Sequence, residues 1–383
     1  MILLFTAIIL YLLYLFLEHR QNEAARRSFL HVIHVNGIRG KTGTCRTLDA
    51  VLRAKYKVFT KTTGTDAAVI DTEGREIPIR RIGPASIGEQ IRILRRAHRE
   101  GADILVIECM AVNPVLQKAA QEQIVKGDIS VITNVRYDHI LDMGETREEI
   151  AESLSAVIPD HGLLVTADPE AEQHFGDACR RKNTELISCP SDGDASDNVR
   201  IARVIASRLG IGDAEFNAQL SRIHEDFGAS RMYEVSGPDG IPYHFLNLFS
   251  VNDPESTEAN FRKALKDFPE GTSPSGVCFL YHHRTDRPDR ALLFARHFFP
   301  LHPDIPLYLC GPGLPLPKRL FAEAGVKDIR ILPLPRTKRG YSDPGAALRF
   351  LPNLPEGTLL VGIGNIKGYA HTLIEQLNQG DTI

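Results

Sequence analysis

Several features that define other classes of protein are scarce or missing in this sequence. Its 383 residues include only six cysteines, and no two of them form a Cys-x-x-Cys pair. A disulfide framework or a zinc ribbon is therefore not expected, and a reducing compartment fits best. Lys and Arg number 45 against 48 for Asp and Glu, which gives a formal net charge of −3. Because there is no basic excess, the composition argues against a general nucleic-acid binder.

Charge is also missing from residues 1–17, which are almost entirely apolar. As a helix this stretch would be about 26 Å long, at the short end of what spans a bilayer. No basic residue precedes it and no small-residue cleavage site follows it, so an uncleaved transmembrane anchor is favoured over a signal peptide or a buried helix. Arg20, Arg26 and Arg27 follow. The positive-inside rule then predicts a single pass with the rest of the chain in the cytoplasm.

The remaining sequence alternates short apolar strands with helical segments. It has 43% hydrophobic and 24% charged residues, as globular proteins do, and its length suggests two or three domains. The alternation starts at His31 and again near Tyr243. It predicts an α/β fold with mostly parallel sheets, helices on both faces and ligands at the carboxyl ends of strands. We expect an anchor over residues 1–17, a central domain over 28–230 and a smaller C-terminal domain over 231–383.

The expected helices are a segment from the Gly-rich turn to about Tyr56, Ile87–Glu100, residues 146–158, and further segments between the strands of the C-terminal half. The strands Ala67–Ile70 and Ile77–Arg80 form a hairpin. The other expected strands are His31–Val35, Val58–Thr60, Asp103–Glu108, Ile129–Asn134, His161–Thr166, His244–Leu248, Val277–Tyr281, Leu307–Leu309, Ile329–Leu332 and Leu359–Ile363.

The most specific motif is a glycine-rich loop between a predicted strand and a predicted helix. Its glycines let the backbone approach a phosphate closely, and the helix N-terminus adds partial positive charge. Lys41 can reach the β- and γ-phosphates, and the Thr42 hydroxyl can bind Mg²⁺. The loop is shorter than the general Gly-x-x-x-x-Gly-Lys-Thr pattern, because Val35 stands where the first glycine would fall. The predicted nucleotide-binding residues here are Asn36, Gly37, Arg39, Gly40, Lys41, Thr42 and Gly43.

Polar residues follow the next strands at what should be the same edge of the sheet. Glu108 ends an apolar strand and is well placed to hold a metal ion, although a helix cap or turn is the alternative. Asn134 ends another strand, and His139 follows five residues later. Taken alone, His139 is more often structural than a ligand. The segment Lys61–Thr63 could bind an anionic substrate or form a polar turn.

The C-terminal half has three further clusters. Asn252 and Asp253 follow a predicted strand and open a helix. Arg284, Arg287 and Arg290 lie close together, and arginines suit bidentate carboxylate recognition. A solvated charged face is the alternative for Arg287 and Arg290. The Gly-rich turn at residues 362–368 is weak evidence on its own.

Together these motifs resemble the Mur-type ligase superfamily, the ATP-dependent amide ligases of peptidoglycan and folylpolyglutamate synthesis. The short phosphate loop matches that family, and Glu108 matches its metal-binding glutamate. Asn134, Asp138 and His139 match its Asn-x-x-x-Asp-His motif, whose histidine is a Mg²⁺ ligand. The family's second acid falls one place later here, at Asp142, so no role is carried onto it.

The C-terminal half extends the resemblance. Arg231 sits where the family has a nucleotide-contacting arginine, and Asn252 with Asp253 looks like its nucleotide-facing motif. Over nearly the whole chain the motifs look most like the ligase subunit of capsular poly-γ-glutamate synthases, which also begins with one apolar segment. The resemblance implies a P-loop ATPase domain of the Mur-ligase type followed by a smaller Rossmann-like ligase domain.

The resemblance implies an ATP-dependent ligase that polymerises glutamate through an acyl phosphate and releases ADP and phosphate. ATP and Mg²⁺ would be its cofactors, glutamate and the growing chain its substrates. A small multi-spanning subunit of the bacterial inner membrane would be its partner in an oligomeric complex. The implied catalytic residues are Lys41, Lys61, Glu108 and His139; the metal ligands are Thr42, Glu108 and His139; and the glutamate-binding residues are Lys61, Thr62, Thr63, Arg284, Arg287 and Arg290.

Two alternative functions remain open from the sequence. One is another glutamate ligase of the same superfamily that acts on a small acceptor such as a folate. The membrane anchor weighs against it, because a soluble acceptor needs no membrane. The other is a membrane-tethered P-loop ATPase that makes no bond, for which ATP hydrolysis would not depend on glutamate.

Overall fold

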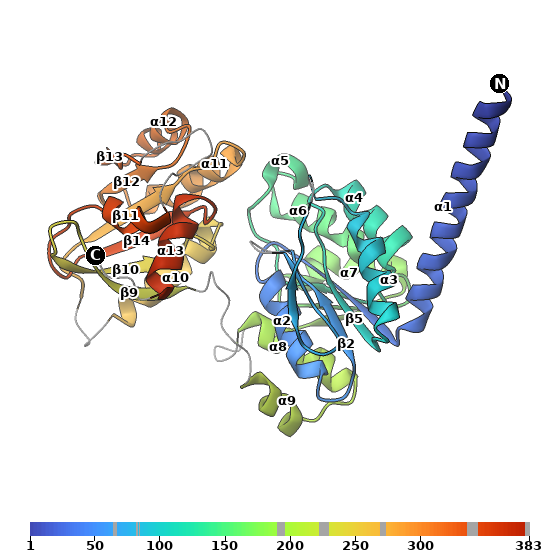
Figure 1. Ribbon diagram of the computed structural model, residues 1–383. Helices are drawn as coiled ribbons and strands as arrows, with labels where there is room; N and C mark the ends of the chain where they lie inside the picture. Colours follow the sequence, from blue (N-terminus) through green and yellow to red (C-terminus); the bar gives the residue numbers. More distant parts are fainter. Residues whose placement is uncertain are drawn as a thin grey trace. The chain divides into compact units, whose positions relative to one another are not determined.

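The fold is described from a computed structural model that covers residues 1–63, 67–81, 83, 85–189, 196–221, 230–268, 273–334 and 344–379. Gly64, Thr65 and Asp66, which follow the predicted Lys61–Thr63 segment, lie outside these residues. The chain divides into two units, shown in Figure 1. The N-terminal unit comprises Met1–Arg136 and Ile140–His224, and the C-terminal unit comprises Tyr137–His139 and Glu225–Ile383.

An eight-stranded sheet forms the centre of the N-terminal unit, in the order β4-β3-β2-β5-β1-β6-β7-β8. Neighbouring strands from β2 through β8 are parallel. The β3–β4 hairpin is antiparallel and forms one edge. The strands are β1 (His31–Asn36), β2 (Val58–Lys61), β3 (Ala68–Ile70), β4 (Glu76–Pro78), β5 (Ile104–Glu108), β6 (Ile129–Ile132), β7 (Leu163–Thr166) and β8 (Glu185–Ser188).

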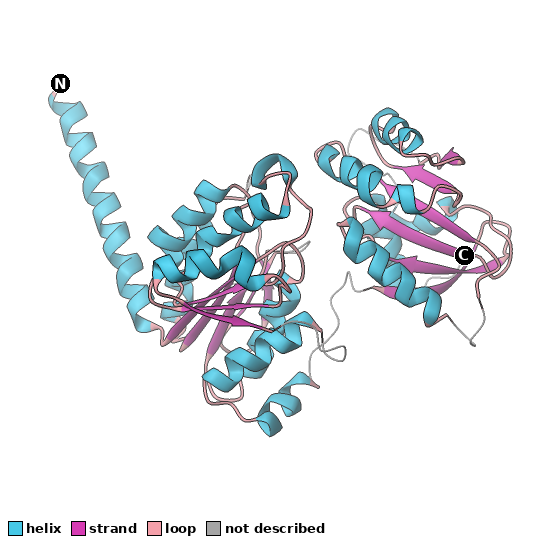
Figure 2. Cartoon of the chain, turned by 180° about the vertical axis from the view of Figure 1, so that it is seen from behind, coloured by secondary structure: helices cyan, strands magenta, loops and turns pink. Residues whose placement is uncertain are grey.

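Helices cover both faces of this sheet, as Figure 2 shows from behind. A π-helical segment at Ala120–Val125 continues α4, and a 3-10 turn at Ser155–Val157 follows α6. The helices are α1 (Ile2–Ser28), α2 (Lys41–Leu52), α3 (Glu89–Arg99), α4 (Pro114–Ala119), α5 (Ile140–Met143), α6 (Arg147–Leu154), α7 (Ala171–Lys182), α8 (Asp197–Arg208) and α9 (Asp213–Leu220).

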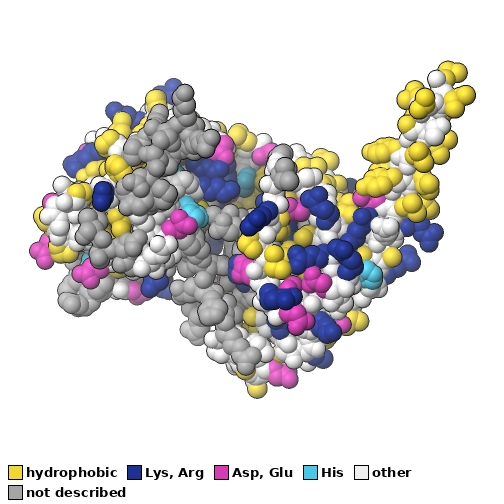
Figure 3. Space-filling view, in the orientation of Figure 1, with side chains coloured by type: hydrophobic (Ala, Val, Ile, Leu, Met, Phe, Trp, Pro, Cys, Tyr) yellow, Lys and Arg dark blue, Asp and Glu magenta, His cyan; other side chains and the backbone are white. Residues whose placement is uncertain are grey.

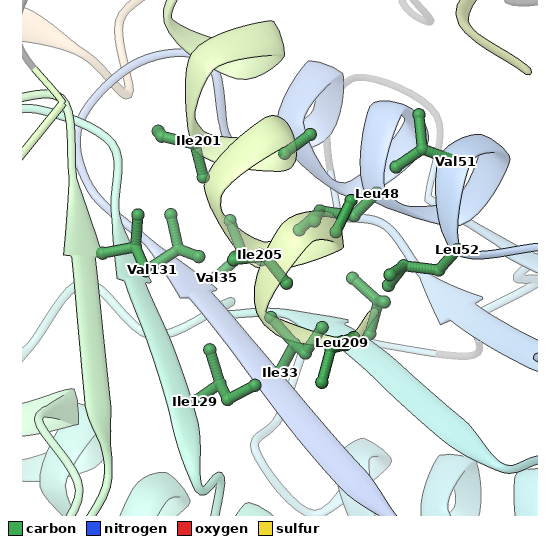
Figure 4. Close-up of a cluster of buried hydrophobic side chains, with 14 of the residues drawn as sticks. Ile33, Val35, Leu48, Val51, Leu52, Ile129, Val131, Ile201, Ile205 and Leu209 are labelled. Carbon is green, nitrogen blue, oxygen red and sulfur yellow. The ribbon is translucent and has the colours of Figure 1, made fainter. Parts of the chain in front are cut away.

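The central strands are apolar without interruption because they are buried on both faces. Successive side chains of a strand point to opposite faces. In β1, Ile33 and Val35 therefore join the core beneath α2 and α8, whereas Val32 joins the core on the α3 side. Figure 4 shows Ile33 and Val35 meeting Leu48 of α2 and Ile205 of α8. This packing fixes the strand that leads into the phosphate loop.

A six-stranded sheet forms the centre of the C-terminal unit, in the order β13-β12-β11-β14-β10-β9. Only β9 is antiparallel to its neighbour among these strands. The strands are β9 (Arg231–Ser236), β10 (Pro242–Asn247), β11 (Val277–His282), β12 (Leu307–Cys310), β13 (Ile329–Ile331) and β14 (Leu359–Gly364). The helices are α10 (Pro254–Lys266), α11 (Pro288–His297), α12 (Pro315–Glu323) and α13 (Tyr369–Gln379), with 3-10 turns at Phe299–Leu301 and Pro344–Phe350.

The predicted α/β fold is confirmed, with differences at its edges. The sequence did not predict β8 and β9, which lie at sheet edges and are partly exposed, so they lack a continuous apolar run. Helix α1 continues beyond the uncharged residues 1–17 to Ser28. It is long and apolar enough to span a membrane. All six cysteines are free thiols; their spacing in the sequence had indicated no disulfide framework.

Candidate active site

The predicted phosphate loop lies between β1 and α2, in the expected strand–loop–helix arrangement. Gly40 precedes the first turn of α2 with a φ of 79°, in the left-handed region that glycine tolerates best. Lys41 and Thr42 therefore begin the helix, where backbone N–H groups lack intrahelical acceptors. The Lys41 ammonium donates to the carbonyl oxygens of Gly37 at 2.6 Å and Ile38 at 3.3 Å. The amine thus lies across the loop that a phosphate would enter.

The loop packs against the segment that follows β6. At Gly37, φ is 118° and an added Cβ would lie 2.1 Å from the Thr133 Oγ1. The Thr133 hydroxyl donates to the Arg39 carbonyl at 2.5 Å. The Asn134 side chain accepts from the Arg39 N–H at 3.0 Å and donates to the Arg39 carbonyl at 3.2 Å. Asn134 thus holds the loop in shape, which is a supporting contact.

Asn36, at the end of β1, takes part in a buried amide pair. Its Nδ2 donates to Oε1 of Gln117 at 2.6 Å, and Gln117 in turn donates to the Val112 carbonyl at 2.7 Å. Both amides are almost completely buried. The bond between Asn36 and Gln117 ties the end of β1 to α4. Gly43 accepts a hydrogen bond at its carbonyl from Thr47, at 2.8 Å.

Glu108 lies at the end of β5, directly beneath the first turn of α2. The Thr42 hydroxyl lies 3.0 Å from its Oε2 and 3.3 Å from its Oε1. The backbone N–H of Thr63 donates to Oε2 at 2.7 Å. Glu108 is buried, with 2% of its surface exposed. Three separate motifs of the sequence therefore meet at one carboxylate.

These oxygen atoms fit a divalent cation. A carboxylate and a threonine hydroxyl are the hard oxygen ligands that Mg²⁺ or Mn²⁺ prefers, and such an ion usually keeps several waters. No group of three or more His, Cys, Asp and Glu residues with metal-site geometry occurs among the residues that the structure describes. Thr42 and Glu108 are thus a partial ligand set that substrate oxygens and water would complete.

Lys61 lies at the end of β2 with its side chain fully buried. Its ammonium pairs with Glu89 at 3.3 Å and lies 3.6 Å from the Met110 sulfur. Arg81 pairs with the same carboxylate at 2.7 Å. Burial lowers the pKa of Lys61, while the charges of Glu89 and Glu108 oppose that shift. A contact between Lys61 and a glutamate substrate would require this ion pair to open.

Thr62 and Thr63 form different hydrogen bonds. The buried Thr62 hydroxyl donates to the Ala68 carbonyl at 3.3 Å, which closes the turn into β3. Thr63 contributes its backbone N–H to Glu108. Within the described residues, Thr63 is the member of this pair that reaches the candidate metal site.

Asp138 and His139 belong to the C-terminal unit, whereas Thr42 and Glu108 belong to the N-terminal unit. His139 has a positive φ of 53°, and its Nε2 lies 3.8 Å from Asp138. Asp138 is almost fully buried and accepts from Arg287 at 2.5 Å. Arg290 lies 3.9 Å from the same carboxylate. Two of the three predicted glutamate-binding arginines thus bind a carboxylate of the Asp-His motif.

Arg284, Arg287 and Arg290 each contact acidic or amide side chains of the C-terminal unit. Arg284 forms a bidentate pair with Asp286, two residues along the chain, on the surface. Arg287 also binds Asp289 at 3.1 Å. Burial lowers the pKa of Arg287, but the charges and hydrogen bonds of Asp138 and Asp289 together outweigh burial, so that the pKa is raised. Arg290 is buried and donates to the side chain of Asn365.

The other predicted nucleotide residues of the C-terminal unit lie at element ends. Asp253 is fully buried and caps α10, accepting from the Ser256 N–H at 2.8 Å. The neighbouring Asn252 has a buried Oδ1 without a hydrogen-bond partner, so a polar ligand atom could satisfy it. Arg231 begins the edge strand β9, with its guanidinium 5.5 Å from the centroid of the Tyr233 ring.

Sequence reasoning missed two groups that shape the site. Glu89 is the partner of Lys61, and its position in the first turn of an Arg-rich helix was the available signal. Asp168 follows β7 and is buried; it accepts from the Val135 N–H at 2.8 Å. Its position after a strand end was the same signal that identified Glu108. Glu89 thus holds the ammonium of Lys61, and Asp168 holds the backbone after β6.

Two family models match the chain. The model described as "Mur ligase middle domain" matches residues 35–217, which include the phosphate loop and Glu108. The model described as "Poly-gamma-glutamate synthase CapB C-terminal domain" matches residues 232–380. The two matches follow one another along the chain.

Solved structures with the same fold have low sequence identity. FolC from E. coli, solved in complex with ADP, has a TM-score of 0.63 at 17% identity and covers 95% of both chains. A folylpolyglutamate synthase/dihydrofolate synthase from Yersinia pestis, complexed with AMPPNP and Mn, has a TM-score of 0.62 at 16% identity, over 93% of this chain and 91% of that one. MurF from Acinetobacter baumannii has a TM-score of 0.60 at 14% identity, over 95% and 79%.

Two curated relatives match at higher identity. PGA synthase CapB of Bacillus subtilis is 32% identical over 380 residues, which cover 95% of this chain and 94% of the relative. The capsule biosynthesis protein CapB of Bacillus anthracis is 31% identical over 94% of this chain and 79% of its own. With matched domains in the same order and nearly full-length coverage, the chain belongs to the CapB family of poly-γ-glutamate synthases.

Proposed function

We propose that this chain is an ATP-dependent ligase that polymerises glutamate into poly-γ-glutamate through an acyl-phosphate intermediate. The observation that carries the proposal is the meeting of Thr42, Glu108 and the Thr63 backbone beneath the phosphate loop. Membership of the CapB family supports the glutamate substrate, and the solved relatives bound to ADP or AMPPNP and Mn support ATP with a divalent cation.

Each residue of the N-terminal site has a role in this chemistry. The N-terminus of α2 and the Lys41 ammonium would hold the negative phosphate oxygens. Thr42 and Glu108 would hold Mg²⁺, which supplies positive charge where phosphate charge develops. His139 is the proposed third ligand, although it belongs to the other unit.

The reaction requires two carboxylate substrates to be oriented. The γ-carboxylate of one glutamate attacks the γ-phosphorus of ATP, and ADP leaves. The amine of a second glutamate then attacks the acyl carbon, and phosphate leaves as the amide forms. Arg284, Arg287, Arg290 and Lys61 are the proposed carboxylate-binding residues, and Asn252, Asp253 and Arg231 are proposed nucleotide contacts. Positioning of these groups supplies much of the rate.

We propose a place at the bacterial inner membrane for this activity. The apolar helix α1 is a candidate span, and the basic residues after it would leave the catalytic units in the cytoplasm. Residues 1–17 would pack against a small multi-spanning subunit within an oligomeric synthase, because a polymer made in the cytoplasm has to cross the membrane.

ADP release from purified membranes tests the ligase function directly. With ATP and Mg²⁺ present, we expect ADP release to rise at least tenfold when glutamate is added and to fall to background for Lys41→Ala. Lys327→Ala, an exposed lysine of the C-terminal unit, is the matched control and should keep full activity. Hydrolysis that is equally fast without glutamate would identify an ATPase that makes no bond.

A further inference from the structure

The second half of α1 is fastened to the N-terminal unit. Asn22 and Ala25 are buried in the contact. The Asn22 side chain donates to the Ile124 carbonyl at 3.0 Å. Arg26 pairs with Asp128 at 2.8 Å. These contacts make the joint between anchor and catalytic unit a packed surface instead of a flexible tether.

The end of α1 lies at the amino ends of the strands. Asp128, the partner of Arg26, directly precedes β6. Leu30 follows α1 and donates its backbone N–H to the carbonyl of Asp103 at 2.8 Å. Asp103 directly precedes β5. The chain therefore reverses here and enters β1.

Helix α3 gives the direction of α1 relative to the sheet. Near the start of α3, the Gln90 side chain donates to the carbonyl of Glu108 at 3.4 Å, at the carboxyl end of β5. Near its end, the His98 ring nitrogen Nδ1 lies 2.7 Å from Oγ of Ser28, at the amino ends. Helix α3 thus crosses the sheet from the carboxyl edge to the amino edge.

Helix α1 packs against α3 and runs the same way. Arg95 donates to the Glu18 carbonyl at 3.1 Å and lies 3.7 Å from its carboxylate. From Ser28 back to Glu18 the helix rises about 15 Å, and the six residues of β1 rise about 20 Å. The uncharged stretch therefore leaves the unit close to the level of the strands' carboxyl ends, where Glu108 lies.

The surface around this exit is basic. Arg20 on α1 and Arg92 on α3 are exposed. Figure 3 shows Lys and Arg side chains gathered on the N-terminal unit beside the base of α1, whereas the outer half of the helix carries apolar side chains. Anionic headgroups attract Lys and Arg side chains that lie near a membrane surface.

We propose that α1 holds the carboxyl edge of the N-terminal sheet, with its phosphate loop, toward the bilayer, and that Arg20 and Arg92 contact anionic headgroups. The proposal rests on the proposed membrane attachment but not on the ligase chemistry. Its consequence is that the growing chain is made next to the membrane. The docked half of α1 is then a positioning element for the phosphate loop and the candidate metal site of the N-terminal unit.

Lipid quenching of fluorophores at the two edges tests this orientation. The full chain would carry a single reporter in a Cys189→Ser background, because the other five cysteines are buried. Val115→Cys places the dye just beyond β5 at the carboxyl edge, where Val115 is 72% exposed. Lys57→Cys places it on an exposed residue just before β2. The vesicles contain phosphatidylcholine, phosphatidylglycerol and a headgroup-labelled nitroxide lipid.

The expected result is at least threefold stronger quenching at Val115→Cys than at Lys57→Cys. A flexible Gly-Ser insertion between Leu17 and Glu18, ahead of the docked half of α1, should equalise the two reporters. Equal or reversed quenching in vesicles that carry the protein would overturn the orientation, whatever the ligase activity. Failure of the protein to float with the vesicles would overturn it as well, because the membrane attachment would then be absent.

A second pair of variants tests the headgroup contact. In the double variant Arg20→Gln/Arg92→Gln, quenching of the dye at Val115→Cys should fall in vesicles that contain phosphatidylglycerol. It should be unchanged in vesicles of phosphatidylcholine alone. No change in either composition would overturn the contact with anionic lipid. Quenching that falls equally in both would assign the arginines to packing instead.

Discussion

The Thr42 hydroxyl and the Glu108 carboxylate lie 3.0 Å apart although 66 residues separate them in the chain. Thr42 is held there by the helix that follows β1, and Glu108 by the end of β5, which pairs with β1. The parallel pairing of these two strands therefore assembles the candidate metal site. A polar residue at the end of one strand becomes functional only because a neighbouring strand ends at the same edge.

We expect Thr42→Val and Glu108→Gln each to lower glutamate-dependent ADP release at least a hundredfold. Both substitutions remove an oxygen ligand or its charge from a site that must stabilise phosphoryl transfer. The thermal unfolding midpoint should change by only a few degrees. Glu122→Gln, on the partly exposed π-helical segment, is the control and should behave as wild type. Unchanged activity in the Glu108 variant would exclude this carboxylate from the reaction.

We expect Gly37→Ala to destabilise the fold by at least about 1 kcal/mol more than Gly101→Ala. Both glycines have a positive φ, but only at Gly37 would the new methyl group meet Thr133, with 2.1 Å to its Oγ1 and 2.7 Å to its backbone nitrogen. Urea unfolding in detergent measures both free energies of unfolding. Equal losses would show that the loop does not need this close approach.

We expect Glu89→Gln to lower the free energy of unfolding by about 3 kcal/mol, because it leaves Lys61 buried with less compensation. Lys61→Met in the same chain should restore part of this loss. The folded-state pKa of Lys61 is already lowered by burial and should fall further in Glu89→Gln. The unfolded state then binds more protons than the folded state, so stability should rise between pH 7 and pH 9. If the free energy of unfolding of Glu89→Gln does not change with pH, Lys61 does not carry a buried charge. The double variant Lys61→Met/Glu89→Gln is the matched control.

We expect the arginines of the C-terminal cluster to separate into two classes. Arg290→Ala should lower stability by about 2 kcal/mol or more, because Arg290 is buried and bonded to Asn365. Arg284→Ala should leave stability nearly unchanged, since exposed pairs contribute little. If Arg284 binds substrate, its loss should raise the KM for glutamate about tenfold with little change in kcat. An unchanged KM would remove Arg284 from the glutamate site.

The sequence was sufficient to predict the alternation of strands and helices and the meeting of the phosphate loop with Glu108. Buried parallel strands have continuous apolar sequences, so β1, β5 and β14 could be predicted. The edge strands β8 and β9 could not, because partial exposure removes that pattern.

Side-chain pairing was much harder to predict than strand order. The sequence predicted that Lys61 binds substrate, because it follows a predicted strand. In the structure its ammonium forms an ion pair with Glu89 on α3. The sequence predicted that Arg287 binds a substrate carboxylate. In the structure it binds the carboxylate of Asp138. In both cases the residue type indicated the chemistry correctly, but only the fold specifies which acid is the partner.

Incorporation of labelled glutamate tests most directly whether the chain makes poly-γ-glutamate. Membranes that contain the complete synthase are incubated with ATP, Mg²⁺ and labelled glutamate, and the product is treated with a γ-specific hydrolase. We expect high-mass labelled material that the hydrolase degrades and that disappears with Lys41→Ala. Absence of such material, while ATP is hydrolysed at an undiminished rate, would contradict this function.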